Sequence, residues 1–224
     1  MALLHIASWL NGIEDVTAAV PAFEKVVPYH RIEGFMGSAM VQRLLDLALG
    51  REGEFVPTKV SNGSAGTVNP VIRSSLLLRD LGELRPELEA RFAAVLDETV
   101  RVLRLSDLRL HSLELELVAH NEGAFYGEHI DTFTALPDAQ SDRALTGVYY
   151  FHRHPKAFSG GELRLHAIAP AADGTRRFTD ILPDLDAFVL FPSWVPHEVR
   201  KVSCCSGAFA DSRFALNCWY RSQR

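Results

Sequence analysis

Cysteine is scarce in this chain of 224 residues. Only three are present, and two of them, Cys204 and Cys205, are adjacent, with Cys218 the third. An odd number in this spacing is neither a disulfide framework nor a zinc-binding pattern. We therefore expect small buried or loop residues in a reducing environment, and a cytoplasmic location.

Long apolar runs and an excess of basic charge are also absent. No segment approaches the roughly 20 apolar residues that a membrane-spanning helix needs. The apolar start, residues 1–12, lacks the positively charged region of a signal peptide. Lys and Arg are scattered along the chain, and the net charge is −5. We expect neither a membrane nor nucleic acid as a partner, and the oligomeric state stays open.

The length fits one domain, and the sequence contains no internal repeat. Residues 1–30 are interpreted as an N-terminal extension of unclear role. Residues 31–224 are predicted to form a single domain, with helical support over 31–105 and a jelly-roll core over 106–224. Apolar residues at helical spacing predict one helix between Phe35 and Leu49 and a second after Pro86, with an apolar stripe from Leu88 to Leu103.

After Leu105 the period of the apolar residues changes from helical spacing to alternation. Leu113 to Leu117 alternates leucine with glutamate, which is typical of a half-buried strand. Further short strand-like runs cover residues 146–152, 162–168, 186–191, 197–202 and 213–220. Helices followed by many short strands predict an α+β fold with an antiparallel sandwich or barrel. A jelly roll is the expected arrangement for this number of short strands.

Two histidines and one carboxylate form a candidate metal site. His129 and Asp131 are two residues apart, so on a strand both side chains leave from the same face. His197 begins a later strand and completes two histidines and one carboxylate on one face of a metal ion. This set is diagnostic of non-heme iron oxygenases, although zinc can use the same ligands.

The last predicted strand carries a candidate anion-binding residue. Its alternation places Arg213, Ala215, Asn217 and Trp219 on one face. An arginine in a packed strand needs an anionic partner, because a buried unpaired charge is costly. A dicarboxylic cosubstrate held there by one end would present its other end to the metal.

Several segments of the chain resemble a known family when they are taken in order. They cover residues 125–131, 149–151, 159–165, 196–199 and 213–219, and residues 72–75 show a weaker similarity. Together they resemble the prolyl 4-hydroxylase-like iron(II) and 2-oxoglutarate-dependent oxygenases. The resemblance covers about half of the chain and implies a double-stranded β-helix (a jelly roll) with supporting N-terminal helices.

The resemblance implies a role for each matching position. His129, Asp131 and His197 match the iron ligands, and no catalytic residue is expected beyond them. The positions that match contacts of 2-oxoglutarate are Arg213 and Tyr150 at its distal carboxylate, Leu163 along its length, and His120, which replaces a tyrosine of the family. Arg143 and Trp219 match positions on the substrate side.

Two stretches depart from the pattern or stay open. The interval from His197 to Arg213 is longer than usual, with residues 203–208 as the predicted insertion. Arg200 and Lys201 therefore compete with Arg213 for the cosubstrate role, and Arg213 is preferred because residues 213–219 match as a unit. Residues 134–142 are either a plain loop or a mobile lid over the substrate.

The expected activity follows from the resemblance. The chain is predicted to be a dioxygenase that uses Fe(II), 2-oxoglutarate and O2, with ascorbate as a further candidate cofactor. It would hydroxylate a protein residue or a small molecule and release succinate and CO2. The retained Asp131 argues against a halogenase, which would need that ligand position for chloride. The alternatives are a cupin-like metal-binding protein that does not use 2-oxoglutarate, and an inactive interaction domain on the same scaffold.

Overall fold

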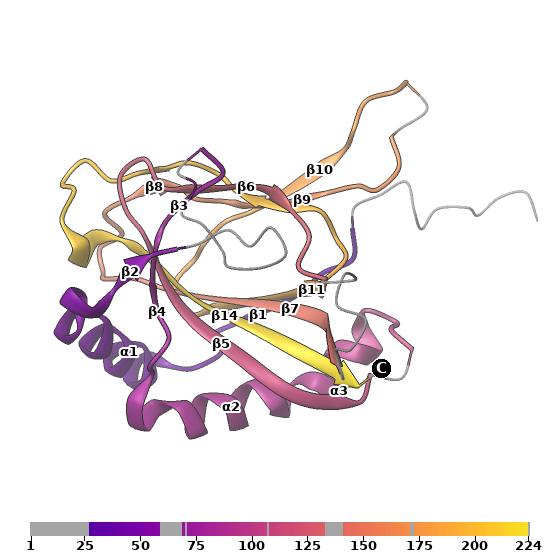
Figure 1. The fold of residues 1–224 in the computed structure, drawn as a ribbon, viewed down its shortest axis with the longest axis horizontal. Coiled ribbons are helices and arrows are strands. Elements are labelled where there is room, and N and C mark those ends of the chain that lie inside the picture. The colour runs from indigo at the N-terminus through magenta and orange to yellow at the C-terminus, as the bar shows by residue number, and fades with distance from the viewer. Residues whose placement is uncertain are drawn as a thin grey trace, which may run out of the picture.

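Two antiparallel sheets lie face to face, and helices cover the outer face of the larger one (Figure 1). The computed structural model describes residues 27–58, 69, 71–106, 108–132, 141–170 and 173–223. Most of the predicted N-terminal extension, residues 1–30, therefore lies outside the described residues. None of the described helices is long and apolar enough to span a membrane.

The larger sheet has seven strands in the order β1–β11–β7–β14–β5–β4–β2. Their bounds are β1 His30–Glu33, β2 Val56–Pro57, β4 Leu76–Leu78, β5 Leu110–His120, β7 Ser141–Phe151, β11 Ala187–Pro192 and β14 Arg213–Gln223. The smaller sheet has the order β10–β9–β12–β6–β3. Its strands are β3 Arg73–Ser74, β6 Phe125–His129, β9 Leu163–His166, β10 Phe178–Ile181 and β12 His197–Val199. A separate two-stranded ladder joins β8 Ser159–Gly160 to β13 Val202–Ser203.

The main strands after residue 109 alternate between the two sheets. β5, β7, β11 and β14 belong to the larger sheet, whereas β6, β9 and β12, which lie between them in sequence, belong to the smaller one. This winding is that of a double-stranded β-helix, so the predicted α+β jelly-roll class is confirmed.

The helices pack against the larger sheet on the side away from the smaller one (Figure 1). They are α1 Ser38–Gly50, α2 Arg85–Ala94 and α3 Leu96–Val102, with short 3-10 turns η1 Glu52–Glu54, η2 Gly82–Leu84 and η3 Phe209–Asp211. The first predicted helix is confirmed by α1. The second is broken at Val95, which leaves helical geometry with a ψ of 1°, although Leu88, Phe92 and Leu96 on its stripe are buried.

Residues 31–105 contribute strands to both sheets as well as helices. The predicted boundary at residue 30 falls inside β1, which pairs with β11. In the same stretch β4 pairs with β5 and β3 pairs with β6, so both sheets extend into the region predicted as helical support.

Alternation along the central strands builds two separate apolar cores. One side of β14, with Phe214, Leu216 and Tyr220, packs toward the helices together with Leu44 and Phe92. The other side faces the smaller sheet, where Ala215 joins a second cluster with Val118, Val148, Leu163 and Leu165. The period of two thus sends one set of side chains to the helices and the other into the space between the sheets, where the candidate site lies.

Candidate active site

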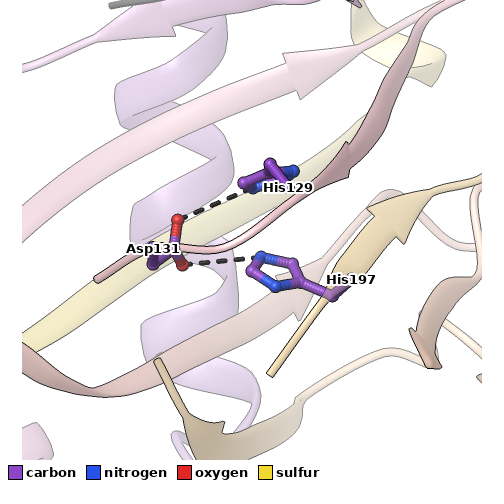
Figure 2. Close-up of side chains that lie close together, drawn as sticks. All are labelled: His129, Asp131 and His197. Carbon is purple, nitrogen blue, oxygen red and sulfur yellow. Dashed lines mark ion pairs between the residues drawn. The ribbon is translucent and has the colours of Figure 1, made fainter. Parts of the chain in front are cut away.

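Three predicted metal ligands converge between neighbouring strands of the smaller sheet (Figure 2). His129 ends β6 and lies opposite His197, the first residue of β12, in the strand register. Asp131 follows β6, and its backbone N–H donates to the Ser193 carbonyl at 2.9 Å. One ligand atom from each of the three side chains lies within 4.8 Å of the other two. Among the described residues, this is the one cluster of His, Cys, Asp and Glu with the spacing of a metal site.

Backbone carbonyls orient both imidazole rings. The His129 Nδ1 lies 2.9 Å from the Gly127 carbonyl, and the His197 Nδ1 lies 2.8 Å from the Val195 carbonyl. A carbonyl only accepts, so each Nδ1 carries a proton, and Nε2 is the ring nitrogen that can bind a metal ion. Both Nε2 atoms point at the Asp131 carboxylate, at 3.6 and 3.5 Å. Two imidazole nitrogens are thus presented toward one point, as a metal ion requires.

The Asp131 carboxylate is held by two side-chain donors from the larger sheet. Its Oδ2 accepts a hydrogen bond from the Thr146 hydroxyl and another from the Trp219 indole N–H, each at 2.8 Å. Burial alone would raise the pKa of this carboxyl, but His197 and His129 outweigh burial and hold it well below its usual value. The carboxylate is therefore ionised and fixed in orientation.

A cavity of about 210 Å³ extends from these ligands between the two sheets. Arg213 and His120 lie on its wall, from neighbouring positions on β14 and β5. Arg213 is 1% exposed, and its Nε donates to the Gly161 carbonyl at 2.8 Å. Leu163 also lines the cavity, whereas Tyr150 lies behind the wall with its ring centroid 4.8 Å from the Arg213 Cζ. The predicted cosubstrate residues therefore gather at one end of the cavity.

Three buried polar atoms at this end have no hydrogen-bond partner among the described residues. They are the Arg213 Nη2, the His120 Nε2 and the Tyr150 hydroxyl. The His120 Nδ1 lies 3.4 Å from the Arg213 Nη1, which can only donate, so the His120 proton is on Nε2. Burial, followed by the charges of Arg213 and Arg73, holds the pKa of His120 well below its usual value. Burial also raises the pKa of Tyr150 to about 12. All three atoms can therefore donate to a ligand, and the Tyr150 hydroxyl also interacts with the Arg213 guanidinium.

Gly161 makes room for Arg213. A Cβ built on this glycine would lie 2.6 Å from the Arg213 Cδ, and its φ of +71° is a conformation that other residues rarely adopt. Local sequence patterns could not predict this contact, because it joins segments more than fifty residues apart.

The competing cations lie outside the cavity. Arg200 is exposed and its Nη1 lies 3.3 Å from Glu198, and Lys201 is exposed as well. The predicted insertion, residues 203–208, forms the end of β13 and the turn before η3. Of residues 134–142, which were predicted to be either a plain loop or a lid, residues 134–140 lie outside the described residues, and residues 141–142 begin β7.

The predicted substrate-side pair lies at the opposite end of the cavity. The Arg143 guanidinium stacks on the Trp219 ring, with its Cζ 3.7 Å from the ring, and it is paired with Glu114. Glu116, two residues along β5, accepts from Arg79 at 2.9 Å. The leucine–glutamate alternation correctly predicted a strand, but its glutamate face lines the cavity. Sequence reasoning missed that role because only the second sheet turns this face into an interior wall.

Comparisons with known proteins agree with this geometry. The model of the 2OG-Fe(II) oxygenase superfamily matches residues 115–221. The matched segment is just under half of the chain and contains His129, Asp131, His197 and Arg213. An uncharacterized PKHD-type hydroxylase of Synechocystis sp. is 31% identical over 199 residues, which are 87% of this chain and 63% of that relative. The chain therefore spans just under two thirds of this relative's length.

Solved oxygenase structures share the fold of the chain. A Pseudomonas putida prolyl-4-hydroxylase aligns with a TM-score of 0.61 at 24% identity, covering 88% of this chain and 93% of that one. A Trichoplax adhaerens prolyl hydroxylase in complex with a peptide fragment of hypoxia inducible factor aligns with a TM-score of 0.61 at 21% identity, covering 87% and 83%. A non-heme alpha ketoglutarate dependent epimerase of nogalamycin biosynthesis aligns with 0.57 at 15% identity, covering 87% and 78%. The superfamily fold is therefore common to proteins with more than one reaction.

Proposed function

We propose that this chain is an Fe(II)- and 2-oxoglutarate-dependent dioxygenase that hydroxylates its substrate and releases succinate and CO2. The observation that carries the proposal is one cavity with two complementary ends. One end presents two imidazoles and a carboxylate, and the other presents a buried guanidinium. An oxygenase that uses both iron and 2-oxoglutarate needs both ends, and the matching superfamily model describes such oxygenases.

The residues of the metal end fit iron. His129, Asp131 and His197 would hold it through two Nε2 atoms and a carboxylate oxygen, which leaves the other side of the ion open. Thr146 and Trp219 would keep the carboxylate oriented toward it. The same atoms accept zinc, so the ligand set supports a divalent metal and the cavity around it supports iron chemistry.

The residues of the other end fit the distal carboxylate of 2-oxoglutarate. The Arg213 Nη2 and the His120 Nε2 are buried donors on the cavity wall. A carboxylate there would satisfy both, and Leu163 would pack along the carbon chain between the two ends. The Tyr150 hydroxyl lies beside Arg213 and would join this group from behind the wall. When bound, iron and 2-oxoglutarate supply the oxidising chemistry, and the protein positions them and excludes water.

A cupin-like protein that uses the metal alone is the second candidate. Such a protein would have no need for a buried arginine with an unpaired nitrogen. Removing that charge from water is costly without an anionic ligand. The Arg213 end therefore favours the dioxygenase.

Protein residues and small molecules are both proposed as substrate classes. The relatives include a PKHD-type hydroxylase and a prolyl hydroxylase in complex with a peptide.

All three cysteines are free thiols, as the predicted reducing cytoplasm would require. Ascorbate stays a candidate cofactor that would keep the iron reduced.

The proposal is tested by reconstitution under argon, followed by exposure to oxygen. The protein loaded with Fe(II), with ascorbate present, should convert 2-oxoglutarate to succinate, and an extract that contains the substrate should increase the rate. The zinc-loaded protein is the control and should be inactive, because zinc has no redox chemistry. Turnover with zinc alone, or an iron-loaded protein that never releases succinate, would reject the dioxygenase.

A further inference from the structure

Arg73 is a cavity residue to which the proposed chemistry gives no task. It lies on the edge strand β3 and pairs with Tyr126 of β6, and both side chains line the cavity. The Arg73 Cζ lies 4.5 Å from the Tyr126 ring centroid. That ring stacks on His129, with centroids 3.6 Å apart and an interplanar angle of 19°. The guanidinium is therefore two stacking contacts away from a predicted metal ligand.

This guanidinium has no carboxylate partner among the described residues. Its Nε donates to the Ser75 hydroxyl at 3.1 Å. Two other arginines of the cavity, Arg79 and Arg143, form ion pairs with Glu116 and Glu114. Burial lowers the pKa of Arg73, and Tyr126, Glu116 and Asp131, which act in the opposite direction, offset the burial only in part. The face of Tyr126 offsets only part of that cost.

The charges of the cavity balance except at Arg73. The metal ion and the Arg213 guanidinium would face Asp131 and the two carboxylates of 2-oxoglutarate, which leaves that group neutral. Glu116 pairs with Arg79, and Glu114 pairs with Arg143 and with Arg221, which lies outside the cavity lining. Among the described residues that line the cavity, Arg73 is then a cation without an ion-pair partner, and an anionic ligand there would be favoured.

We propose, on the basis of the proposed dioxygenase function, that the substrate carries a carboxylate close to the carbon that reacts, and that Arg73 binds it. The Tyr126 ring and the Ser75 hydroxyl hold the Arg73 side chain in place, and a planar guanidinium can bind a carboxylate through two parallel hydrogen bonds. The cavity of about 210 Å³ is smaller than the roughly 300–1,000 Å³ of pockets for drug-sized ligands. The part of the substrate that enters it is therefore small, either a free carboxylic acid or one acidic side chain of a peptide.

The test compares carboxylates with their amides on the whole protein, loaded with Fe(II) and 2-oxoglutarate without oxygen. Free amino acids and amino acid amides form one arm, and capped peptides that contain Asp or Asn form the other. Binding is followed by calorimetry and by the change in the metal absorption band. In one arm the carboxylate should bind at least about 30-fold more tightly than its amide. The arm that shows this preference identifies the substrate as either a free carboxylic acid or a peptide with an acidic side chain.

Variants connect that preference to Arg73. Arg73→Gln should abolish the difference between carboxylate and amide, and Arg73→Lys should restore part of it because a point charge remains. Arg200→Gln, which removes an exposed cation outside the cavity, is the matched control and should keep the full preference.

The outcomes that overturn this inference differ from those that reject the dioxygenase. Equal binding of acids and amides in both arms, no binding of any carboxylate, or an unchanged preference in Arg73→Gln would overturn it. Weaker binding of 2-oxoglutarate in Arg73→Gln would also overturn it, because Arg73 would then serve the cosubstrate. Iron and 2-oxoglutarate binding are measured in the same samples, so a failure of the proposed function is seen separately.

Discussion

The two ends of the cavity differ in how far the protein satisfies its own polar groups. At the metal end, backbone carbonyls accept from both imidazoles, and two side chains donate to the carboxylate. At the other end, buried donor atoms on Arg213, His120 and Tyr150 have no partner among the described residues. The metal end is ordered by hydrogen bonds within the protein, whereas the other end needs an acceptor from outside it.

This difference predicts that the two ends can be damaged separately. Residues that orient the metal ligands should affect iron binding and leave 2-oxoglutarate recognition intact. Residues of the donor end should affect 2-oxoglutarate and leave iron in place. A variant that damages both equally would show that the ends are not independent.

The largest effect is expected from Asp131→Ala. It removes the carboxylate from the metal set, so succinate formation should be abolished and bound iron lost, as measured by metal analysis and product assay. The fold should persist, and the metal-free variant should unfold at a lower temperature than the unchanged protein, because Thr146 and Trp219 lose the carboxylate that accepts their hydrogen bonds. Near-normal succinate production by this variant would show that our ligand assignment is wrong.

Arg213→Ala should damage the opposite end. Losing a buried, charge-assisted pair costs about 2–5 kcal/mol, which is a loss of roughly 30-fold or more in 2-oxoglutarate affinity. Arg213→Lys should lose less, and iron binding should barely change in either variant. The measurement is a 2-oxoglutarate titration of the iron-loaded protein without oxygen.

Arg200→Ala and Lys201→Ala are the matched controls for Arg213. Both side chains are exposed outside the cavity, so 2-oxoglutarate should bind normally to both variants. If Arg200→Ala were the damaging change and Arg213→Ala bound normally, the assignment of the cosubstrate end would have to be redrawn.

Trp219→Phe tests whether Trp219 acts at the metal end of the cavity. Trp219 was predicted on the substrate side, but its indole N–H also donates to the Asp131 carboxylate. Loss of that hydrogen bond should weaken iron binding about 10-fold, as is typical of groups that orient metal ligands. 2-Oxoglutarate affinity at saturating iron should stay within about 2-fold of the unchanged protein. Iron affinity is measured by equilibrium dialysis, and an unchanged value would restrict Trp219 to the substrate side.

The smallest effect concerns His120 and pH. Its pKa in the folded chain lies well below the usual value, near 6.5, that it regains on unfolding. Below that pH the unfolded chain binds a proton that the folded chain does not, so the free energy of unfolding falls as pH is lowered. His120→Gln removes this contribution, of at most about 1.4 kcal/mol per pH unit. Urea unfolding between about pH 5 and 6.5 should show a shallower slope for the variant, and parallel slopes would contradict a neutral buried His120.

Local patterns predicted the elements of the fold that repeat with a fixed period. The alternation from Arg213 to Trp219 assigned the inward face of β14 correctly, because successive side chains of a strand must point to opposite sides. The spacing of His129 and Asp131 likewise predicted that both side chains point toward the same site, where the structure places them. The short strands β2 and β3 carry too few residues for any period to show, so the stretch before residue 106 was interpreted as helical support, and only the weaker resemblance at residues 72–75 pointed to a strand where β3 lies.

Contacts between distant segments could not be predicted from local patterns. The hydrogen bond from Thr146 to Asp131, the clearance between Gly161 and Arg213, and the stacking of Arg73 on Tyr126 depend on which strands become neighbours. That arrangement is decided by the register of the sheets, which residue composition does not encode locally. The glutamates of β5 illustrate the same limit, since a polar face becomes an interior wall only when a second sheet covers it.

Arg213 and Trp219 lie on one uninterrupted strand, β14, which pairs along its length with β5 and β7. The proposed anchor for the distal carboxylate and the donor to the Asp131 carboxylate are therefore spaced by a paired backbone and by no loop. Under the proposed function, this fixed spacing sets the length of ligand that can bridge the cavity. We expect a dicarboxylic oxo acid with one methylene fewer or one more than 2-oxoglutarate to reach only one of the two ends, so that the strand would select the cosubstrate by its number of carbons.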